Sequence, residues 1–132
     1  MGMDQYAYRV KKENVFNAFY FHRGHRLQNG FDTLGNEVDY FTWDDFPELY
    51  KFMKDIYEKK GGKKEFNLIT IQLSAEDLYR LYEAAQQDEF YKDNYIETKK
   101  NRTYKYDYLM EFIHKARKAM KDGDYIYYEP WY

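Results

Sequence analysis

Three stretches of the chain place apolar residues at the spacing of one helix face. The last is the clearest, and its stripe consists of Leu109, Phe112, Ile113, Ala116 and Met120. We predict that this helix opens at Asp107 and stops at Gly123, because glycine accepts the positive φ that ends many helices. Residues 125–128, Tyr-Ile-Tyr-Tyr, follow directly and are typical of a strand. A helix followed at once by a strand predicts a unit in which the helix packs on a sheet.

Two earlier helices are predicted from start signals followed by apolar stripes. The first is capped by Asp44 or Asp45, has Pro47 in its first turn and ends at the glycine pair 61–62. Its inward stripe consists of Leu49, Phe52, Met53, Ile56 and Tyr57. The second opens with residues 74–77, Ser-Ala-Glu-Asp, which are typical of a capping box. Its buried face consists of Leu78, Leu81, Tyr82 and Ala85.

Alternating apolar and polar residues indicate the strands. We predict strands over residues 4–10, 66–73 and 125–128, with a further short strand over residues 37–42. Residues 15–21 fit either a strand or a short helix, and the strand is slightly favoured. Two segments are predicted to be loops: 22–35, which is punctuated by glycine, and 87–106, which is polar.

The order of these elements predicts a single α+β domain over residues 1–132, with about three helices packed on one face of a mostly antiparallel sheet. A chain of 132 residues fits one domain. Aromatic residues make up 22% of it, namely 17 Tyr, 10 Phe and 2 Trp, so a small core can bury a large area. Two interpretations of the tyrosines stay open: a tyrosine-rich core and sheet face, or a recognition surface.

The chain lacks the features of secreted and membrane proteins. It has no cysteine, which excludes disulfides and thiolate chemistry. No apolar run approaches the roughly 20 residues that cross a bilayer, and the start of the sequence has no basic region followed by an apolar one. We therefore expect a cytoplasmic protein without a membrane partner.

No phosphate-binding loop, nucleophile elbow or zinc-protease motif is present, so we expect neither enzyme activity nor a cofactor. His22 and His25 have an H-x-x-H spacing, but without cysteine they are interpreted as part of a basic surface loop. His114 lies off the apolar stripe and is predicted to face solvent. Asp44 and Asp45 have the chemistry to hold a hard cation, but helix capping accounts for both. We predict no metal site.

The net charge of −2 is unevenly distributed along the chain. Residues 31–58 carry eight acids and two lysines, and residues 98–121 carry eight bases and two acids. Each run is either a solvated face or a binding patch for a partner.

The acidic run suggests a partner-binding patch in which carboxylates stand among aromatic rings. Its residues are Glu37, Asp39, Tyr40, Trp43, Asp44, Asp45 and Glu48. Such a patch suits docking on a nucleic-acid-binding protein, because it presents charge where a phosphate backbone would lie. The basic run suggests an alternative surface for a nucleotide or a nucleic acid, since it mixes cations with stacking rings. Its residues are Tyr95, Lys99, Lys100, Arg102, Tyr104, Lys105, Tyr106 and Arg117.

Short motifs spread over nearly the whole chain carry a family resemblance. The opening, M-G-M-D-Q-Y-A-Y, fits the pattern M-G-x-D-x-Y-x-Y, and the end, from Gly123 to Trp131, fits G-x-x-[VI]-Y-Y-x-x-W. Further matching positions are Trp43, Pro47, Leu49, Phe52, Met53 and residues 65–67, 73–78 and 112–119. In these motifs the chain resembles a family of small uncharacterised phage and prophage proteins, which often carry a phosphoglycerate-kinase label.

The chain departs from the family at several polar positions. Asp44 and Asp45 stand where the family has Arg-Lys, Tyr50 stands where it has His, and a Gly-Phe-Phe-Phe-Gly stretch before the last helix is missing. A polar site built on those family residues is therefore not expected here. The kinase label has no support, because the chain has no phosphate-cradling loop. What the resemblance implies is a phage origin and an accessory role.

The sequence thus leads to two functional hypotheses. The first is a non-enzymatic phage accessory protein that binds and modulates a host protein, such as an anti-CRISPR-like or other inhibitor of antiviral defence. The alternative is a nucleotide-binding or nucleic-acid-binding protein, either a ligand sequesterer or a small enzyme, that uses the Tyr/Lys/Arg surface. The oligomeric state is not predicted.

Overall fold

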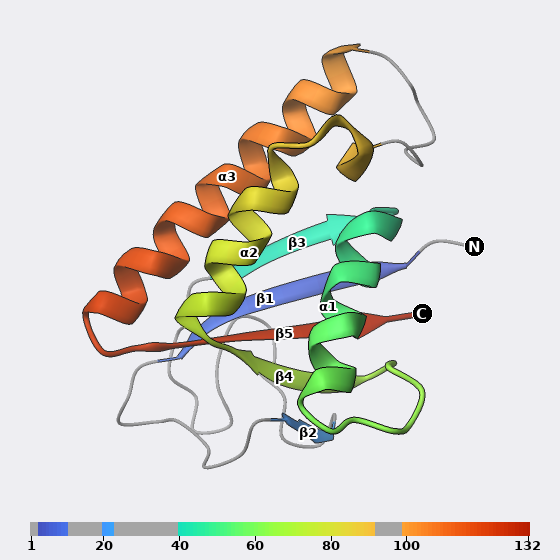
Figure 1. Cartoon of the computed structure of the whole chain (residues 1–132), viewed down its shortest axis with the longest axis vertical. Coiled ribbons are helices and arrows are strands. Elements are labelled where there is room, and N and C mark those ends of the chain that lie inside the picture. Colours follow the sequence, from blue (N-terminus) through green and yellow to red (C-terminus); the bar gives the residue numbers. More distant parts are fainter. Residues whose placement is uncertain (1–2, 11–19, 23–39, 92–98) are drawn as a thin grey trace.

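The computed structural model describes residues 3–10, 20–22, 40–91 and 99–132. Its strands form one antiparallel sheet in the order β2-β4-β5-β1-β3 (Figure 1). The strands are β1 (Asp4–Val10), β2 (Tyr20–His22), β3 (Tyr40–Asp44), β4 (Ile69–Leu73) and β5 (Tyr125–Trp131). The helices are α1 (Pro47–Lys59), α2 (Ala75–Ala85), the 3-10 helix η3 (Asp88–Tyr91) and α3 (Lys99–Lys121).

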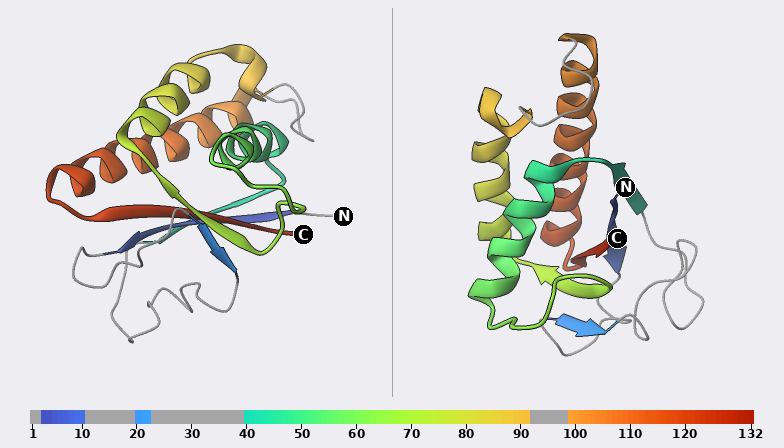
Figure 2. Two further views of the ribbon diagram at one scale, coloured as in Figure 1. Left: turned by 60° about the horizontal axis from the view of Figure 1, so that its bottom comes forward. Right: turned by 90° about the vertical axis from the view of Figure 1, so that its right-hand side faces the viewer.

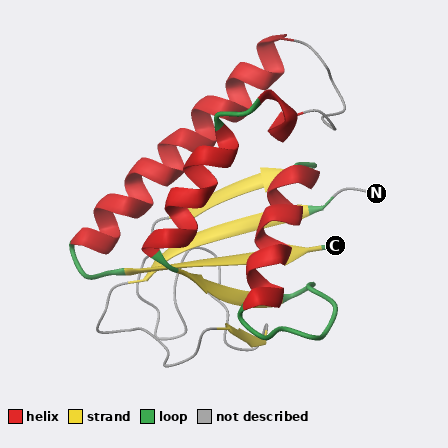
Figure 3. Ribbon diagram, in the orientation of Figure 1, coloured by secondary structure: helices red, strands yellow, loops and turns green. Residues whose placement is uncertain are grey.

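The helices α1, α2 and α3 all lie on one face of the sheet (Figures 2 and 3). The main core fills the space between these helices and the sheet. Its fully buried side chains include Ala7, Leu49, Met53, Ile71, Leu78, Leu109, Ile113 and Tyr128. This arrangement confirms the predicted α+β fold, with helices on one side of an antiparallel sheet. None of the described helices is long and apolar enough to cross a membrane.

The central strand of the sheet is β5, which lies between β4 and β1. It pairs with β1 over seven residues, from Asp4 opposite Trp131 to Val10 opposite Tyr125. Ile126 and Tyr128 belong to the core under the helices, so the alternating residues Tyr127 and Glu129 point to the opposite face. The Glu129 side chain is buried there and accepts hydrogen bonds from the Thr70 hydroxyl, at 2.7 Å, and from the Trp131 indole N–H.

A buried polar chain ties β1 and β5 to the start of α1. The Gln5 amide donates to the Phe46 carbonyl oxygen at 3.0 Å, and the Tyr128 hydroxyl donates to Gln5 Oε1 at 2.5 Å. Both side chains are inaccessible to solvent, and burial raises the pKa of Tyr128 well above its ordinary value. The Gln5 amide and the Tyr128 hydroxyl can be buried without a large desolvation cost because each has a hydrogen-bond partner.

The predicted cap of the first helix is wrong. Asp44 is the last residue of β3, and Asp45 is a turn residue with φ of 47°, a conformation that Asp tolerates better than most residues. Phe46 takes the N-cap position without a side-chain cap, and Pro47 starts the helix as predicted. The second helix matches its prediction, because Ser74 and Asp77 exchange both bonds of a capping box, at 3.0 and 2.8 Å.

The third helix is longer than predicted. It begins at Lys99, eight residues before Asp107, and η3 occupies a further part of the segment that we predicted to be a loop. Contacts with the rest of the fold support these polar turns, since the Tyr106 ring packs edge-to-face on Tyr91 at 6.4 Å. The predicted stop is confirmed: Gly123 has φ of 90°, and the N–H groups of residues 123 and 124 donate back to Met120 and Ala119.

The strand boundaries also shift. The strand predicted over residues 66–73 begins only at Ile69, because Leu68 has φ of 60° and Phe66 turns into the core to stack on Tyr57 at 4.5 Å. Of the short strand predicted over residues 37–42, residues 40–42 lie in β3, which continues to Asp44, and residues 37–39 lie outside the described part. The strand β5 continues past residue 128 to Trp131. Of the ambiguous segment 15–21, only residues 20 and 21 are described, and they lie in β2; residues 15–19 lie outside the described part.

Candidate functional site

Three exposed carboxylates gather at one end of the sheet. Asp4 of β1 and Asp44 of β3 are directly opposite each other in the strand register, and Asp45 follows in the turn to α1. Their neighbours Gln5 and Trp43 are buried, so alternation places Asp4 and Asp44 together on the sheet face away from the helices. We call Asp4, Asp44 and Asp45 the acidic edge.

Like charges in direct cross-strand contact are unfavourable, and the acidic edge shows this in its protonation. The pKa of Asp4 is raised above its ordinary value of 3.8. The main cause is a hydrogen bond that protonated Asp4 donates to Asp44, followed by burial and by the negative charges of Asp44 and Asp45. The fold therefore holds these carboxylates together against their mutual repulsion.

Asp4→Asn is expected to raise the free energy of unfolding at pH 7 and to change it little near pH 3. Because the pKa of Asp4 is higher in the folded than in the unfolded state, the folded state is favoured when Asp4 is protonated and loses stability as the pH rises through that range. Asparagine keeps a donor toward Asp44 and carries no charge. Urea unfolding at both pH values tests this; a loss of stability at pH 7, or the same gain at pH 3, would contradict it.

Of the other residues of the predicted acidic aromatic patch, Trp43 and Glu48 are described with their side chains, and neither joins this surface. Trp43 is only 5% exposed and contacts Phe112 at 5.2 Å and Tyr108 at 5.7 Å, so its ring belongs to the core. Glu48 is also buried. Glu37 and Asp39 lie outside the described residues. Tyr40 is the first residue of β3, but its side chain is not among the described ones.

Lys105 lies against the acidic edge instead of on a basic surface. Its ammonium group donates to the Asp45 carbonyl oxygen at 2.9 Å and lies 5.0 Å from the centre of the Phe46 ring. Burial lowers the pKa of Lys105, while the negative charges of Glu48, Asp45 and Asp44 oppose that shift. The cation thus fastens α3 to the start of α1 and neutralises part of the acidic charge.

The remaining residues of the predicted basic surface are distributed around α3. Tyr104 is 70% exposed, the Tyr106 hydroxyl is 3.4 Å from Gln86 Oε1, and Arg117 is exposed more than three helical turns further on. Tyr95 lies outside the described residues, as do the side chains of Lys99, Lys100 and Arg102 in the first turn of α3. The described members therefore do not form one ligand site.

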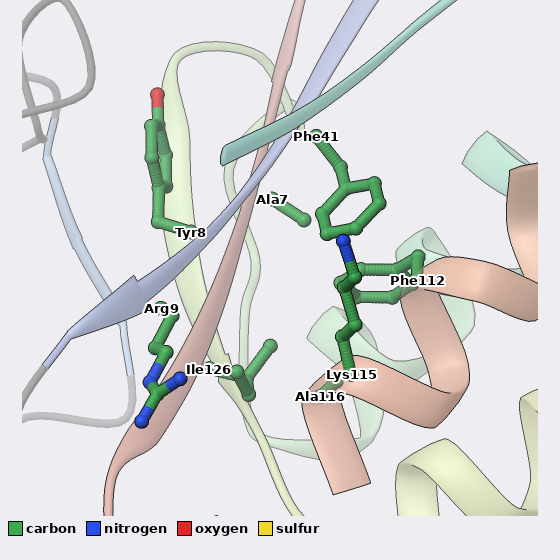
Figure 4. Close-up of a pocket in the computed structure, with 8 residues that line it drawn as sticks. All are labelled: Ala7, Tyr8, Arg9, Phe41, Phe112, Lys115, Ala116 and Ile126. Atoms are coloured by element: carbon green, nitrogen blue, oxygen red, sulfur yellow. The ribbon is translucent and has the colours of Figure 1, made fainter. Parts of the chain in front are cut away.

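A cleft of about 540 Å³ lies on another side of α3, where the helix passes the end of β1 and the start of β3. We call it the α3 cleft, and its lining consists of Arg9, Phe41, Tyr108, Glu111, Lys115, Lys118 and Asp122. This volume falls within the range of about 300–1,000 Å³ that is usual for small-molecule sites. An apolar crevice adjoins it, in which Phe41, Phe112 and Lys115 gather between the sheet and α3 (Figure 4).

Aromatic contacts fix the wall of the α3 cleft. The Phe41 and Tyr108 rings meet edge-to-face at 5.4 Å, and the Tyr108 hydroxyl accepts a hydrogen bond from the Thr42 N–H at 3.1 Å. That N–H points away from β1, so Tyr108 satisfies a donor on the outer side of β3. Tyr104 lies one turn earlier on α3 and is nearly parallel to Tyr108, at 6° and 6.4 Å.

Contacts with neighbouring side chains position two of the three cations of the α3 cleft. Asp124 accepts from Arg9 at 2.9 Å from Nε and at 2.6 Å from Nη2, which orients the guanidinium group. Lys115 lies 5.7 Å from the centre of the Phe41 ring and 3.1 Å from Glu111. Lys118 is exposed and forms no ion pair with any residue in the part of the chain that the structure describes.

Sequence reasoning missed most of these cleft residues. The local signal is the helical stripe along α3, where the cleft residues Tyr108, Glu111, Lys115 and Lys118 follow one another at spacings of three and four. Arg9 and Phe41 reach the cleft through the pairing of β1 with β3, which the sequence alone does not reveal.

In the part of the chain that the structure describes, no histidine takes part in a metal site. His114 is exposed on α3, as predicted. His25 and the side chain of His22 lie outside the described residues. Within the described ranges, no group of three or more His, Asp or Glu side chains has the geometry to hold a metal ion.

Comparison of the chain with protein families, with curated proteins and with solved structures found no match. The resemblance to phage proteins thus stays a prediction from the sequence motifs. Functional arguments for this chain accordingly depend on the acidic edge and the α3 cleft themselves.

Proposed function

We propose that the protein binds a partner protein through its acidic edge, and that this partner presents a basic surface. The observation that carries the proposal is the close placement of Asp4, Asp44 and Asp45, in which a hydrogen bond to Asp44, burial and the neighbouring negative charges raise the pKa of Asp4. A surface that lowers stability in this way is typical of a binding site, where the charge is compensated only in the complex.

The phage-family resemblance gives this proposal a biological setting. An accessory protein of a phage acts on host components, and nucleic-acid-binding host proteins carry the basic surfaces that an acidic edge complements. We therefore propose a host protein as the partner, for example a nuclease or effector of antiviral defence that the phage protein inhibits. The acidic edge would inhibit the partner by occupying its phosphate-binding site, because exposed carboxylates have the same sign of charge as a nucleic-acid backbone.

A capture experiment with matched variants tests the acidic edge. Purified protein immobilised at about 50 mM salt should retain a stoichiometric partner from bacterial lysate, and the complex should weaken as salt screens the charges. The triple variant Asp4→Asn, Asp44→Asn, Asp45→Asn should lose the partner. A control with the same charge change, Glu58→Gln, Glu83→Gln, Glu89→Gln, alters exposed side chains elsewhere and should retain it.

Two outcomes would overturn the proposal. One is the recovery of no stoichiometric partner at low salt. The other is equal retention of a partner by the acidic-edge variant and by the control, which would show that the edge does not form the interface.

A further inference from the structure

The α3 cleft offers a second binding site that is separate from the acidic edge. It combines a volume suited to a small molecule with two aromatic rings and three cations. The rings are Phe41 and Tyr108, and the cations are Arg9, Lys115 and Lys118. We propose that this cleft binds a nucleotide.

The rings supply the surface for a base. Tyr108 is held by its bond to the Thr42 N–H and by its contact with Phe41, so its orientation is fixed before a ligand arrives. Tyr104 is parallel to it and extends the aromatic surface into solvent. Any nucleobase can stack on such rings because every base has a flat π-face. Proteins use this contact to bind bases without reading their hydrogen-bonding groups.

The cations supply the surface for phosphates. Lys115 and Lys118 are three residues apart on α3 and therefore neighbours on its surface, and Arg9 faces them from β1. Asp124 holds the Arg9 guanidinium in place, which lowers the entropy cost of a contact with a ligand. Tyr108 and Lys118 are ten residues apart, or about 15 Å along the helix, which matches an extended nucleotide with its phosphates.

Two carboxylates of the cleft compete with such a ligand. Glu111 is 3.1 Å from Lys115, and Asp122 is 3.9 Å from Arg9. The Lys115–Glu111 pair is exposed, and Asp122 is exposed at the long end of its contact with the half-buried Arg9. Pairs of that kind contribute little, so a phosphate with its larger charge displaces both carboxylates. With Asp124 on Arg9 counted, three cations stand against three carboxylates, so the cleft gains positive charge only when a ligand displaces Glu111 and Asp122. Such a site favours a single nucleotide over a long nucleic-acid strand with many phosphates to neutralise.

Calorimetric titration of the whole chain with ATP tests the site, with adenosine, inorganic tripolyphosphate and a twelve-nucleotide single-stranded DNA as comparison ligands. ATP should bind more tightly than adenosine or tripolyphosphate, since it engages both rings and cations. Lys118→Gln should weaken ATP binding about tenfold, while Lys121→Gln, an exposed lysine of α3 outside the cleft lining, should leave it unchanged. Tyr104→Ala should weaken ATP binding and leave tripolyphosphate binding unaffected.

The sign of the Glu111 effect gives the sharpest control. Glu111→Gln removes a competitor of the phosphates and should tighten ATP binding several-fold; weaker binding by this variant would overturn the proposal. So would a lack of ATP binding at 1 mM, an equal affinity of wild type and Lys118→Gln, tripolyphosphate binding as tight as ATP, or tighter binding of the single strand than of ATP. None of these variants alters the acidic edge, so failure here and failure of the partner-protein proposal are distinguishable.

Discussion

Replacement of Phe112 by alanine is expected to lower the free energy of unfolding by about 3–5 kcal/mol. Phe112 is 2% exposed, and its ring meets Phe41 at 5.3 Å and Trp43 at 5.2 Å. It therefore joins α3 to β3, the strand at one end of the described sheet order. Alanine would leave a cavity between a helix and a sheet that cannot easily close on it, because other core contacts hold both in place.

Urea unfolding monitored by far-UV circular dichroism measures this loss. Arg117→Ala is the matched control, since Arg117 is exposed on the same helix and its removal should change the free energy of unfolding by less than about 0.5 kcal/mol. A loss below 1 kcal/mol for Phe112→Ala would mean that the ring cluster does not hold α3 on the sheet.

Tyr128→Phe is expected to make the protein less sensitive to alkaline pH. In the wild type, the unfolded chain ionises Tyr128 above its ordinary pKa of 10.0, whereas burial keeps the folded chain protonated. The free energy of unfolding therefore falls by about 1.4 kcal/mol for each pH unit above 10, as long as the folded state stays protonated. Phenylalanine has no proton to lose, so this part of the pH dependence disappears.

The same variant should be less stable at neutral pH. Tyr128→Phe leaves Gln5 Oε1 without its donor in the core, which costs about 1–3 kcal/mol. Urea unfolding at intervals between pH 9.5 and 11.5 separates the two effects, and Tyr79→Phe is the control because Tyr79 is 53% exposed. Equal slopes against pH for wild type and Tyr128→Phe would show that Tyr128 ionises in the folded state.

Local patterns predicted the parts of the fold that depend on neighbouring residues. The alternation in β1, the capping box at Ser74 and the glycine stop at Gly123 all act within a few residues, and the structure confirms each. The start of α3 was missed because its polar turns have no apolar stripe, and contacts such as that of Lys105 with the Asp45 carbonyl support them.

The candidate sites were harder to predict because they depend on strand register and on burial. Asp4 is 40 positions from Asp44 in the chain, and only the pairing of β1 with β3 brings their carboxylates together. Acidic residues nearby in the sequence favour a surface position for Trp43, although alternation with Thr42 and Asp44 turns its side chain to the helices. Composition alone does not tell which side chains of this short strand face the helices and which face away from them.

The pairing of β1 with β5 has a consequence for synthesis. Ribosomes make this chain from β1 toward β5, so the strand that occupies the middle of the sheet is translated after all the other described elements. Until β5 leaves the ribosome, β1 and β4 have no strand between them to join them into one sheet. The apolar surface of these strands is then exposed to chaperones or to aggregation. Closure across such a long sequence separation also slows folding relative to a protein of similar size built from local contacts.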